Sequence, residues 1–366
     1  ALAFFVLAAG LGIPLTVLIG RNYAEDDTRR DAGYTLFYLA INFGGFVAPI
    51  VCATWIGHAF GYRWGFISAA VGMALGAAVF DWTHRQMPGA GDSVPHGGPR
   101  ATPIVLLAML ALVYPTALLL AHPDVLHVAV YALMALMIGY FIASSFRRGD
   151  RVQGQRYLAM LLLFVAMVLF WALSLQGATS LNFFARDYVR APFDFSVFQS
   201  ANPLYILFLA PLLALLWPWL DRRGINPSTP RKFGIGLLLV ALSYGVMVYA
   251  AAHMVGADGR VPWWPLALCY LLQTLGELAL SPIGYAMVTR LAAPEEASLA
   301  MGGWFFGVGV SYDLTGRIAA MTTMSATSGI AGYGHVYALL LWAGVGIGLL
   351  YLLGAPWITK LMHGAR

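Results

Sequence analysis

Long apolar segments separated by short polar ones organise this chain. Eleven segments approach the length of about 20 mainly apolar residues that a helix needs to cross a bilayer core. They cover residues 1–20, 34–57, 64–83, 103–121, 126–146, 157–178, 198–219, 232–252, 263–289, 299–324 and 335–358. Strand-like alternation of apolar and polar positions is absent from the sequence of these segments, which argues against a barrel. The pattern predicts an all-α, polytopic membrane protein whose backbone polar groups bond within each helix.

Composition supports this class and excludes several others. Hydrophobic residues make up 60% of the 366 residues and charged residues 10%, whereas soluble domains carry about 25% charged residues. The net charge of +5 comes from basic residues in short loops, without the basic stripe of a nucleic-acid binder. The two cysteines, Cys52 and Cys269, lie in apolar segments and indicate neither disulfides nor a metal site. The sequence shows no nucleophile or metalloprotease motif, so we expect no enzyme, metal or cofactor.

The distribution of basic residues predicts how the spans are oriented. If the loop after the first span is cytoplasmic, 16 of the 21 Lys and Arg residues fall on the cytoplasmic side. This is a strong positive-inside bias, and it supports the count of spans, because one missed helix would scramble it. Residues 83–103, 147–156 and 221–232 are the polar linkers on that side, and the spans between the first two linkers look like a peripheral hairpin.

One segment carries a carboxylate far from any basic residue in the sequence. In YLLQTLGELALSPIGYAM (270–287), polar residues recur every fourth position at Gln273, Glu277, Ser281 and Tyr285. This spacing keeps them on one face of a helix. A carboxyl group removed from water is costly to ionise, so it can gain or lose a proton when its surroundings change. We interpret Glu277 as a proton-coupling or amine-binding group; the alternative is a protonated Glu bonded to a neighbouring helix.

Three other segments place polar groups at membrane depth. Tyr38 and Asn42 share a helix face, and Asn42 could equally hold two helices together. Trp171 shares a face with Leu175, in a segment that could also be an aromatic anchor. From spacing alone, Asn202 before Pro203 is better explained as a helix cap.

Several of these segments resemble one known family. DAGYTLFYLAINFGGFVAPIVC (31–52), FWALSLQGATSLNFFA (170–185), NPLYI (202–206), LLQTLGELALSPIGYAMVTRLAAP (271–294) and MGGWFF (301–306) follow the motifs of the proton-dependent oligopeptide transporters in order and spacing. This family is a branch of the major facilitator superfamily. The resemblance runs along essentially the whole chain, and it implies two six-helix bundles with an inserted hairpin.

The resemblance also implies a domain layout. Residues 1–84 would be the remainder of the N-terminal bundle, with core helices four to six, and 85–154 the linker and inserted hairpin. Residues 155–366 would form a complete C-terminal six-helix bundle. The first three core helices, with the ExxER motif, have no counterpart here, so we expect a truncated or partial transporter.

By resemblance, the substrate site would consist of residues from both bundles, with Glu277 also in proton coupling. These are Tyr38, Asn42, Trp171, Asn202, Glu277, Ser281 and Trp304. For Asn202, the resemblance replaces the capping interpretation.

Two departures from the family's pattern bear on this site. The family's fourth helix carries a Lys, but GLGIPLTVLIG (10–20) has none. The family's seventh helix has an acidic residue where this chain has Leu175. Without that Lys, an ionised Glu277 costs more, which weakens the usual coupling scheme.

The leading hypothesis is proton-coupled symport of di- and tripeptides by alternating access. It would act as a multi-pass monomer in the bacterial cytoplasmic membrane, with peptide and protons as its partners. One alternative is a transporter of another small substrate, such as a modified amino acid or an organic anion. Another is a truncated paralogue or scaffold that transports nothing.

Overall fold

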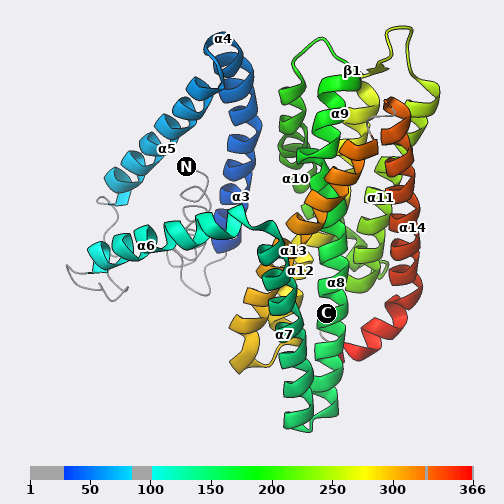
Figure 1. Cartoon of the computed structure of the whole chain (residues 1–366). Coiled ribbons are helices and arrows are strands. Elements are labelled where there is room, and N and C mark those ends of the chain that lie inside the picture. Colours follow the sequence, from blue (N-terminus) through cyan, green and yellow to red (C-terminus); the bar gives the residue numbers. More distant parts are fainter. Residues whose placement is uncertain (1–28, 85–100, 326–328, 365–366) are drawn as a thin grey trace. The chain divides into compact units, whose positions relative to one another are not determined.

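A computed structural model of the chain describes residues 29–84, 101–325 and 329–364 (Figure 1). Helices dominate these ranges and confirm the all-α prediction. The strands found in them are two residues long: β1 (Val189–Arg190) and β2 (Val261–Pro262) pair in parallel, with Val189 opposite Val261. The predicted span 1–20 and most of the linker 83–103 lie outside the described residues.

The chain divides into two compact units. Unit 1 consists of Ala1–Gly44 and Val51–Val130, and unit 2 consists of Gly45–Ile50 and Tyr131–Arg366. The predicted domain boundaries near residues 84 and 154 stay predictions.

Unit 1 is built from helices that follow one another in sequence. Helix α3 (Arg29–Ala48), which extends into unit 2 at its end, runs directly into the π-helical η1 (Pro49–Gly57) and the short α4 (His58–Phe60). The chain turns at Gly61, whose φ of 94° is a conformation that suits glycine. It continues as α5 (Tyr62–His84) and α6 (Ala101–Ala121).

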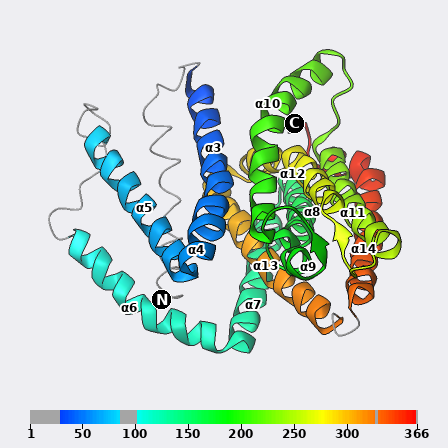
Figure 2. The ribbon, with the colours of Figure 1, turned by 90° about the horizontal axis from the view of Figure 1, so that it is seen from above.

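Unit 2 is a helical bundle around α8. It contains α7 (Pro123–Arg148) from Tyr131 onwards, α8 (Arg151–Ser174), α9 (Ser180–Tyr188), α10 (Ala201–Arg222), α11 (Thr229–His253), α12 (Trp264–Leu291), α13 (Ala297–Ser325) and α14 (Ile330–Leu361). Short 3₁₀ turns η2 (Leu175–Ala178), η3 (Phe195–Ser200) and η4 (Pro294–Glu296) lie between them. Helix α8 contacts α11, α12, α13 and α14, and Figure 2 shows it among them.

Close packing of α11 against α12 fixes which face of α12 points inward. A Cβ atom added to Gly276 would lie 2.8 Å from the carbonyl oxygen of Gly236, and one added to Gly236 would lie 3.0 Å from that of Gly276. Helices in lipid associate mainly through such tight van der Waals contact, because lipid tails are as apolar as the side chains. The neighbouring Glu277 is therefore held at a set orientation.

Seven helical segments among the described residues are long and apolar enough to cross a membrane, and 107–121 and 264–280 are shorter apolar helices. The predicted boundaries need correction at several ends. Helix α8 begins at Arg151 and not at residue 157, so the predicted linker 147–156 is a tight turn at Gly149 and Asp150. The Asp150 carboxylate accepts from the N–H of Val152 and caps α8. Hydropathy marks the apolar stretch of a helix, whereas the hydrogen-bonded helix extends beyond it.

Candidate functional site

A polar cavity of about 210 Å³ lies inside unit 2, between α8, α10, α12 and the turns η2 and η3. Its lining consists of Trp171, Ser174, Leu175, Gly177, Ala178, Gln199, Asn202, Pro203, Tyr270, Gln273 and Glu277. The helices around it are otherwise apolar, so these polar groups converge on one place. Concave sites with a few converging polar groups are the usual form of small-molecule sites.

Glu277 is held in this cavity by a neutral amide. The Asn202 Nδ2 donates to Glu277 Oε2 at 2.8 Å and also lies 3.0 Å from the Oγ1 of Thr274. Thr274 in turn donates its hydroxyl to the carbonyl oxygen of Tyr270, one turn earlier in α12. Glu277 is partly buried and forms no ion pair with another described residue. An amide partner tolerates both protonation states of a carboxyl group, because it can donate or accept.

The structure shows why the capping explanation of Asn202 was wrong. Ser200 is the N-cap of α10, and Asn202 lies inside its first turn. The 3₁₀ turn η3 leads directly into α10, so the helix begins before the Asn-Pro pair. The Asn202 side chain is thus free of a capping role and reaches across to α12.

A break in helical structure forms one wall of the cavity. Between α8 and α9 the chain passes through η2, and the carbonyl oxygen of Gly177 accepts from Tyr270 Oη at 2.7 Å and from Gln199 Nε2 at 2.9 Å. The buried Gln176 donates to the carbonyl oxygens of Ala172 and Thr315. Irregular backbone at membrane depth is tolerated where it is buried or lines a cavity. This wall therefore has a fixed shape.

The other predicted site residues fall in different places. Trp171 lines the cavity beside Glu277, and Gln273 lies on the same wall, as its four-residue spacing predicts. Trp304 is only 2% exposed and is not among the lining residues. A Cβ atom added to Gly284 of α12 would lie 2.4 Å from the Trp304 ring, so Trp304 packs α13 onto α12. Ser281 lies one turn beyond Glu277 in α12.

Tyr38 and Asn42 lie in unit 1, one turn apart on α3. The Asn42 Nδ2 donates to the carbonyl oxygen of Tyr38 at 2.9 Å. Asn42 is buried, whereas Tyr38 is 38% exposed. This bond satisfies the costly amide within its own helix. The role of both residues in substrate binding stays a prediction.

The sequence reasoning missed Gln199 and Tyr270 as cavity residues. Gln199 lies in η3, a turn that has no helical periodicity to place it. Tyr270 lies four residues before Thr274 and seven before Glu277, so the helical spacing that identified Glu277 could have found it. The described residues contain no group of three or more His, Cys, Asp or Glu that could hold a metal ion.

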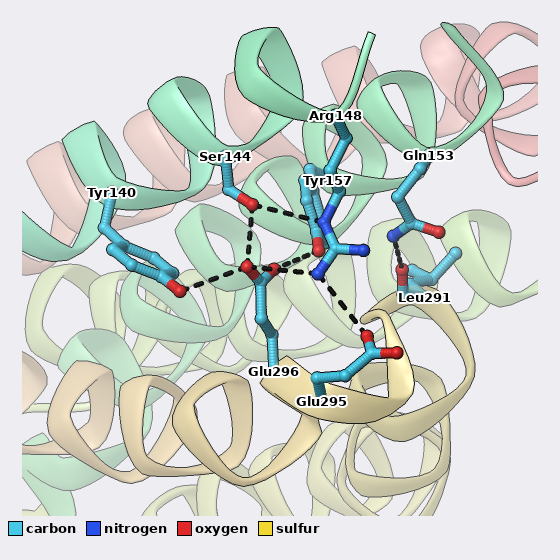
Figure 3. Close-up of polar contacts among 8 residues, drawn as sticks. All are labelled: Tyr140, Ser144, Arg148, Gln153, Tyr157, Leu291, Glu295 and Glu296. Atoms are coloured by element: carbon cyan, nitrogen blue, oxygen red, sulfur yellow. Dashed lines mark hydrogen bonds and ion pairs between the residues drawn. The ribbon is translucent and has the colours of Figure 1, made fainter. Parts of the chain in front are cut away.

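A second carboxylate, the buried Glu296, lies beyond the other end of α12, in the turn η4 (Figure 3). Its Oε1 accepts from Tyr140 Oη at 3.0 Å and from Ser144 Oγ at 2.7 Å, both on α7. Its Oε2 accepts from Tyr157 Oη on α8, and Arg148 pairs with Oε1 at 3.4 Å. The carboxylate joins α7, α8 and the α12–α13 turn.

Glu296 has a depressed pKa. Burial by itself raises the pKa of this carboxyl group, but donors from Tyr157, Ser144, Tyr140 and Arg148 outweigh burial and lower the pKa to about 2. A carboxylate that accepts several hydrogen bonds is stabilised in its charged form. Glu296 therefore stays ionised over the physiological pH range.

These features define a helical, multi-pass membrane protein with a polar cavity inside one bundle. The model of the POT family matches residues 2–336, and the chain belongs to that family. This confirms the resemblance drawn from the sequence motifs.

Named relatives agree with this assignment. The chain is 34% identical to "Uncharacterized transporter YclF" of Bacillus subtilis, over 88% of this chain and 67% of the relative. It is 35% identical to "Peptide transporter YePEPT" of Yersinia enterocolitica, over 83% of this chain and 64% of the relative. The chain thus spans about two thirds of the length of these relatives. The proteins that it matches are transporters and not enzymes.

Solved structures show the same fold. A crystal structure of a variant of the peptide transporter POT with alafosfalin superposes with a TM-score of 0.79 at 32% identity, covering 95% of this chain and 72% of the other. A POT family transporter with 5-aminolevulinic acid superposes with a TM-score of 0.76 at 25% identity, covering 94% and 73%. The major facilitator fold expected from the sequence is confirmed.

Proposed function

We propose that the protein carries di- and tripeptides across the bacterial cytoplasmic membrane together with protons, by alternating access. One observation carries this proposal: Glu277 faces a polar cavity inside the bundle and is held by the neutral Asn202. Intramembrane ionisable residues that face a cavity mark substrate or proton pathways. We further propose that the transporter acts as a monomer.

Glu277 would take up a proton from one side and release it to the other. Its hydrogen-bond partner among the described residues is the amide of Asn202, so no described cation holds it ionised. A proton, or the ammonium group of a peptide, could each neutralise it in the cavity. The membrane potential can drive the cycle, because one charge moved through 100 mV yields about 2.3 kcal/mol. Relatives named as peptide transporters and di-/tripeptide transporters support the substrate class.

The test is uptake of a radiolabelled dipeptide by the purified transporter in proteoliposomes, with and without an inward proton gradient. With the gradient, we expect the dipeptide inside the vesicles to exceed its external concentration. When a protonophore removes the gradient, we expect no such accumulation. Unlabelled tripeptides should compete, whereas tetrapeptides and free amino acids should not. If no di- or tripeptide is accumulated or competes, the peptide assignment is wrong. No uptake of any substrate would favour the non-transporting paralogue.

Leu175 favours a second candidate, a carrier of another small substrate such as a modified amino acid or an organic anion. It lines the cavity, where it contributes an apolar surface in place of the acidic residue that the resemblance led us to expect. A cavity with fewer charges would bind the termini of a peptide less strongly, and related structures hold alafosfalin or 5-aminolevulinic acid. A thermal-shift panel of dipeptides, phosphono-peptides and amino acid analogues separates the candidates. Stabilisation by non-peptides alone would favour this second one.

A further inference from the structure

A wholly apolar groove of about 310 Å³ lies between α7, α8 and α13, away from the polar cavity. Met134, Met137 and Ile138 of α7 face Leu158, Leu162 and Val165 of α8 across it. The α8 residues lie at spacings of four and three, so they form one continuous stripe along the helix. Flexible Met side chains adapt to irregular occupants.

The groove lies within two membrane-spanning segments, Pro123–Arg148 and Arg151–Tyr188. Apolar cavities in proteins stay dry and accept apolar molecules; one of about 150 Å³ takes benzene. Leu158 and Val165 remain 43% and 48% exposed, so the groove is reachable from the surrounding bilayer. Its occupant must therefore be apolar and must enter from the lipid side.

A second cavity of about 320 Å³, lined by both polar and apolar residues, lies at the turn between α7 and α8. It shares Leu158 with the apolar groove, and Asp150, Arg151 and Gln155 are among its other lining residues. Arg151 is exposed and forms no ion pair with another described residue, whereas the nearby Asp150 caps α8. The positive-inside pattern predicts that this turn faces the cytoplasm, where the leaflet carries anionic lipids.

The dimensions match one lipid of one leaflet. At about 1.5 Å per residue, the groove from Leu158 to Val168 extends about 15 Å along α8, half of a hydrocarbon core of about 30 Å. Arg151 lies two turns before Leu158, about 10 Å away, where a headgroup would lie. The apolar groove and the exposed basic group of Arg151 therefore follow each other along α8 in the order of the acyl chain and the headgroup of a phospholipid.

We propose that an anionic glycerophospholipid of the surrounding bilayer binds between α7 and α8. One acyl chain fills the groove, and the phosphate lies at the turn beside Arg151. Basic pockets between transmembrane helices on the cytoplasmic side select anionic headgroups in this way.

The experiment uses the purified transporter in phosphatidylcholine nanodiscs that contain a small fraction of phosphatidylglycerol with a diazirine on one acyl chain. Crosslinks mapped by mass spectrometry should concentrate on residues 134–138 and 158–168. The photoreactive phosphatidylglycerol should label these residues about fivefold more than a phosphatidylcholine that carries the same reactive chain. This factor corresponds to about 1 kcal/mol, the attraction of one basic group to an anionic lipid surface. Even labelling of all lipid-facing helices, or equal labelling by the two lipids, would overturn the proposal.

Variants separate the chain site from the headgroup site. Val165→Trp should fill the groove and abolish the local crosslinks, whereas Leu339→Trp on the exposed face of α14 should leave them unchanged. Arg151→Gln should remove the preference for phosphatidylglycerol. Two controls should keep it: Arg151→Lys, which retains the positive charge, and Arg223→Gln, which removes a charge at another turn. If Val165→Trp does not fold, Leu162→Phe makes the same test. An unchanged preference in Arg151→Gln would contradict the headgroup assignment.

Discussion

Glu277 is a partly buried carboxylate and Glu296 a buried carboxylate of the same bundle, and their surroundings differ. Glu277 lines a cavity, and its hydrogen-bond partner among the described residues is the neutral amide of Asn202. Glu296 lies in a turn, where three hydroxyl groups and Arg148 surround it. The first environment allows the charge to change, and the second fixes it. The same residue type thus lines a cavity in one place and joins helices in the other.

The largest expected effect comes from removing the titratable group of the cavity. Glu277→Gln keeps a hydrogen-bonding side chain of the same shape but cannot exchange a proton. Gradient-driven dipeptide uptake should fall by about 100-fold or more, as for other positioned proton-transfer groups. Counterflow exchange at equal pH should persist. The control is Asp124→Asn, an exposed carboxylate at the start of α7, which should transport normally. If Glu277→Gln still took up dipeptide normally when driven by the gradient, Glu277 would have no part in proton coupling.

Removing the charge of Glu296 should instead lower stability. Its pKa of about 2 lies below the ordinary value of 4.5, which corresponds to about 3 kcal/mol in favour of the folded state. Glu296→Gln should therefore lower the thermal unfolding temperature in detergent, while the KM for uptake at permissive temperature changes little. Asp258→Asn, an exposed carboxylate, is the control. Unchanged stability would mean that the bonds to Glu296 contribute nothing net.

The pH dependence sharpens this prediction. Because the folded-state pKa is depressed, the stabilisation by Glu296 is complete above about pH 4.5 and is lost as the pH falls towards about 2. The difference in unfolding temperature between the wild type and Glu296→Gln should be constant from pH 5 to 8 and shrink below about pH 4.5. A difference that grew with acidification would have the wrong sign for this mechanism.

A moderate effect is expected from the partner of Glu277. Asn202→Ala leaves the carboxyl group without its amide donor, at a cost of about 1–3 kcal/mol. The KM for dipeptide uptake should rise about tenfold, since 1.4 kcal/mol is a factor of ten. Asn226→Ala, in the linker after α10, is the matched control. An unaltered KM in Asn202→Ala would show that Glu277 does not depend on this amide.

The smallest effect is expected at Arg148. Its contacts with Ser144, Glu295 and Glu296 are all 3.4 Å long, and Glu295 is exposed to solvent. Arg148→Gln should therefore cost no more than about 1 kcal/mol. Thermal unfolding of Arg148→Gln and Glu296→Gln, measured side by side, gives the ratio of their losses of stability. If Arg148→Gln were as destabilising as Glu296→Gln, the ion pair and not the hydroxyl donors would hold this turn.

Much of the fold could be predicted, because membrane helices carry their signal in local composition. The spans from 34–57 onwards each correspond to a described helix, although α8 begins before its apolar stretch and residues 29–33 are already helical. The spacing of α12 correctly placed Gln273 and Glu277 on one face. It could not place Gln199, which reaches the cavity from an irregular turn.

The sequence by itself determined the membrane class, the order of the helices and the presence of an isolated carboxylate in α12. These follow from residue type and helical period, which act within one segment. Only the tertiary structure decided which groups meet that carboxylate. Its own segment makes Asn202 look like a helix cap, whereas in the bundle Asn202 bonds to Glu277. Trp304 is buried against Gly284 and does not line the cavity. The same holds for Glu296, whose donors come from helices 139 to 156 residues earlier in the chain. Contacts between distant segments depend on how helices pack, which no single segment encodes.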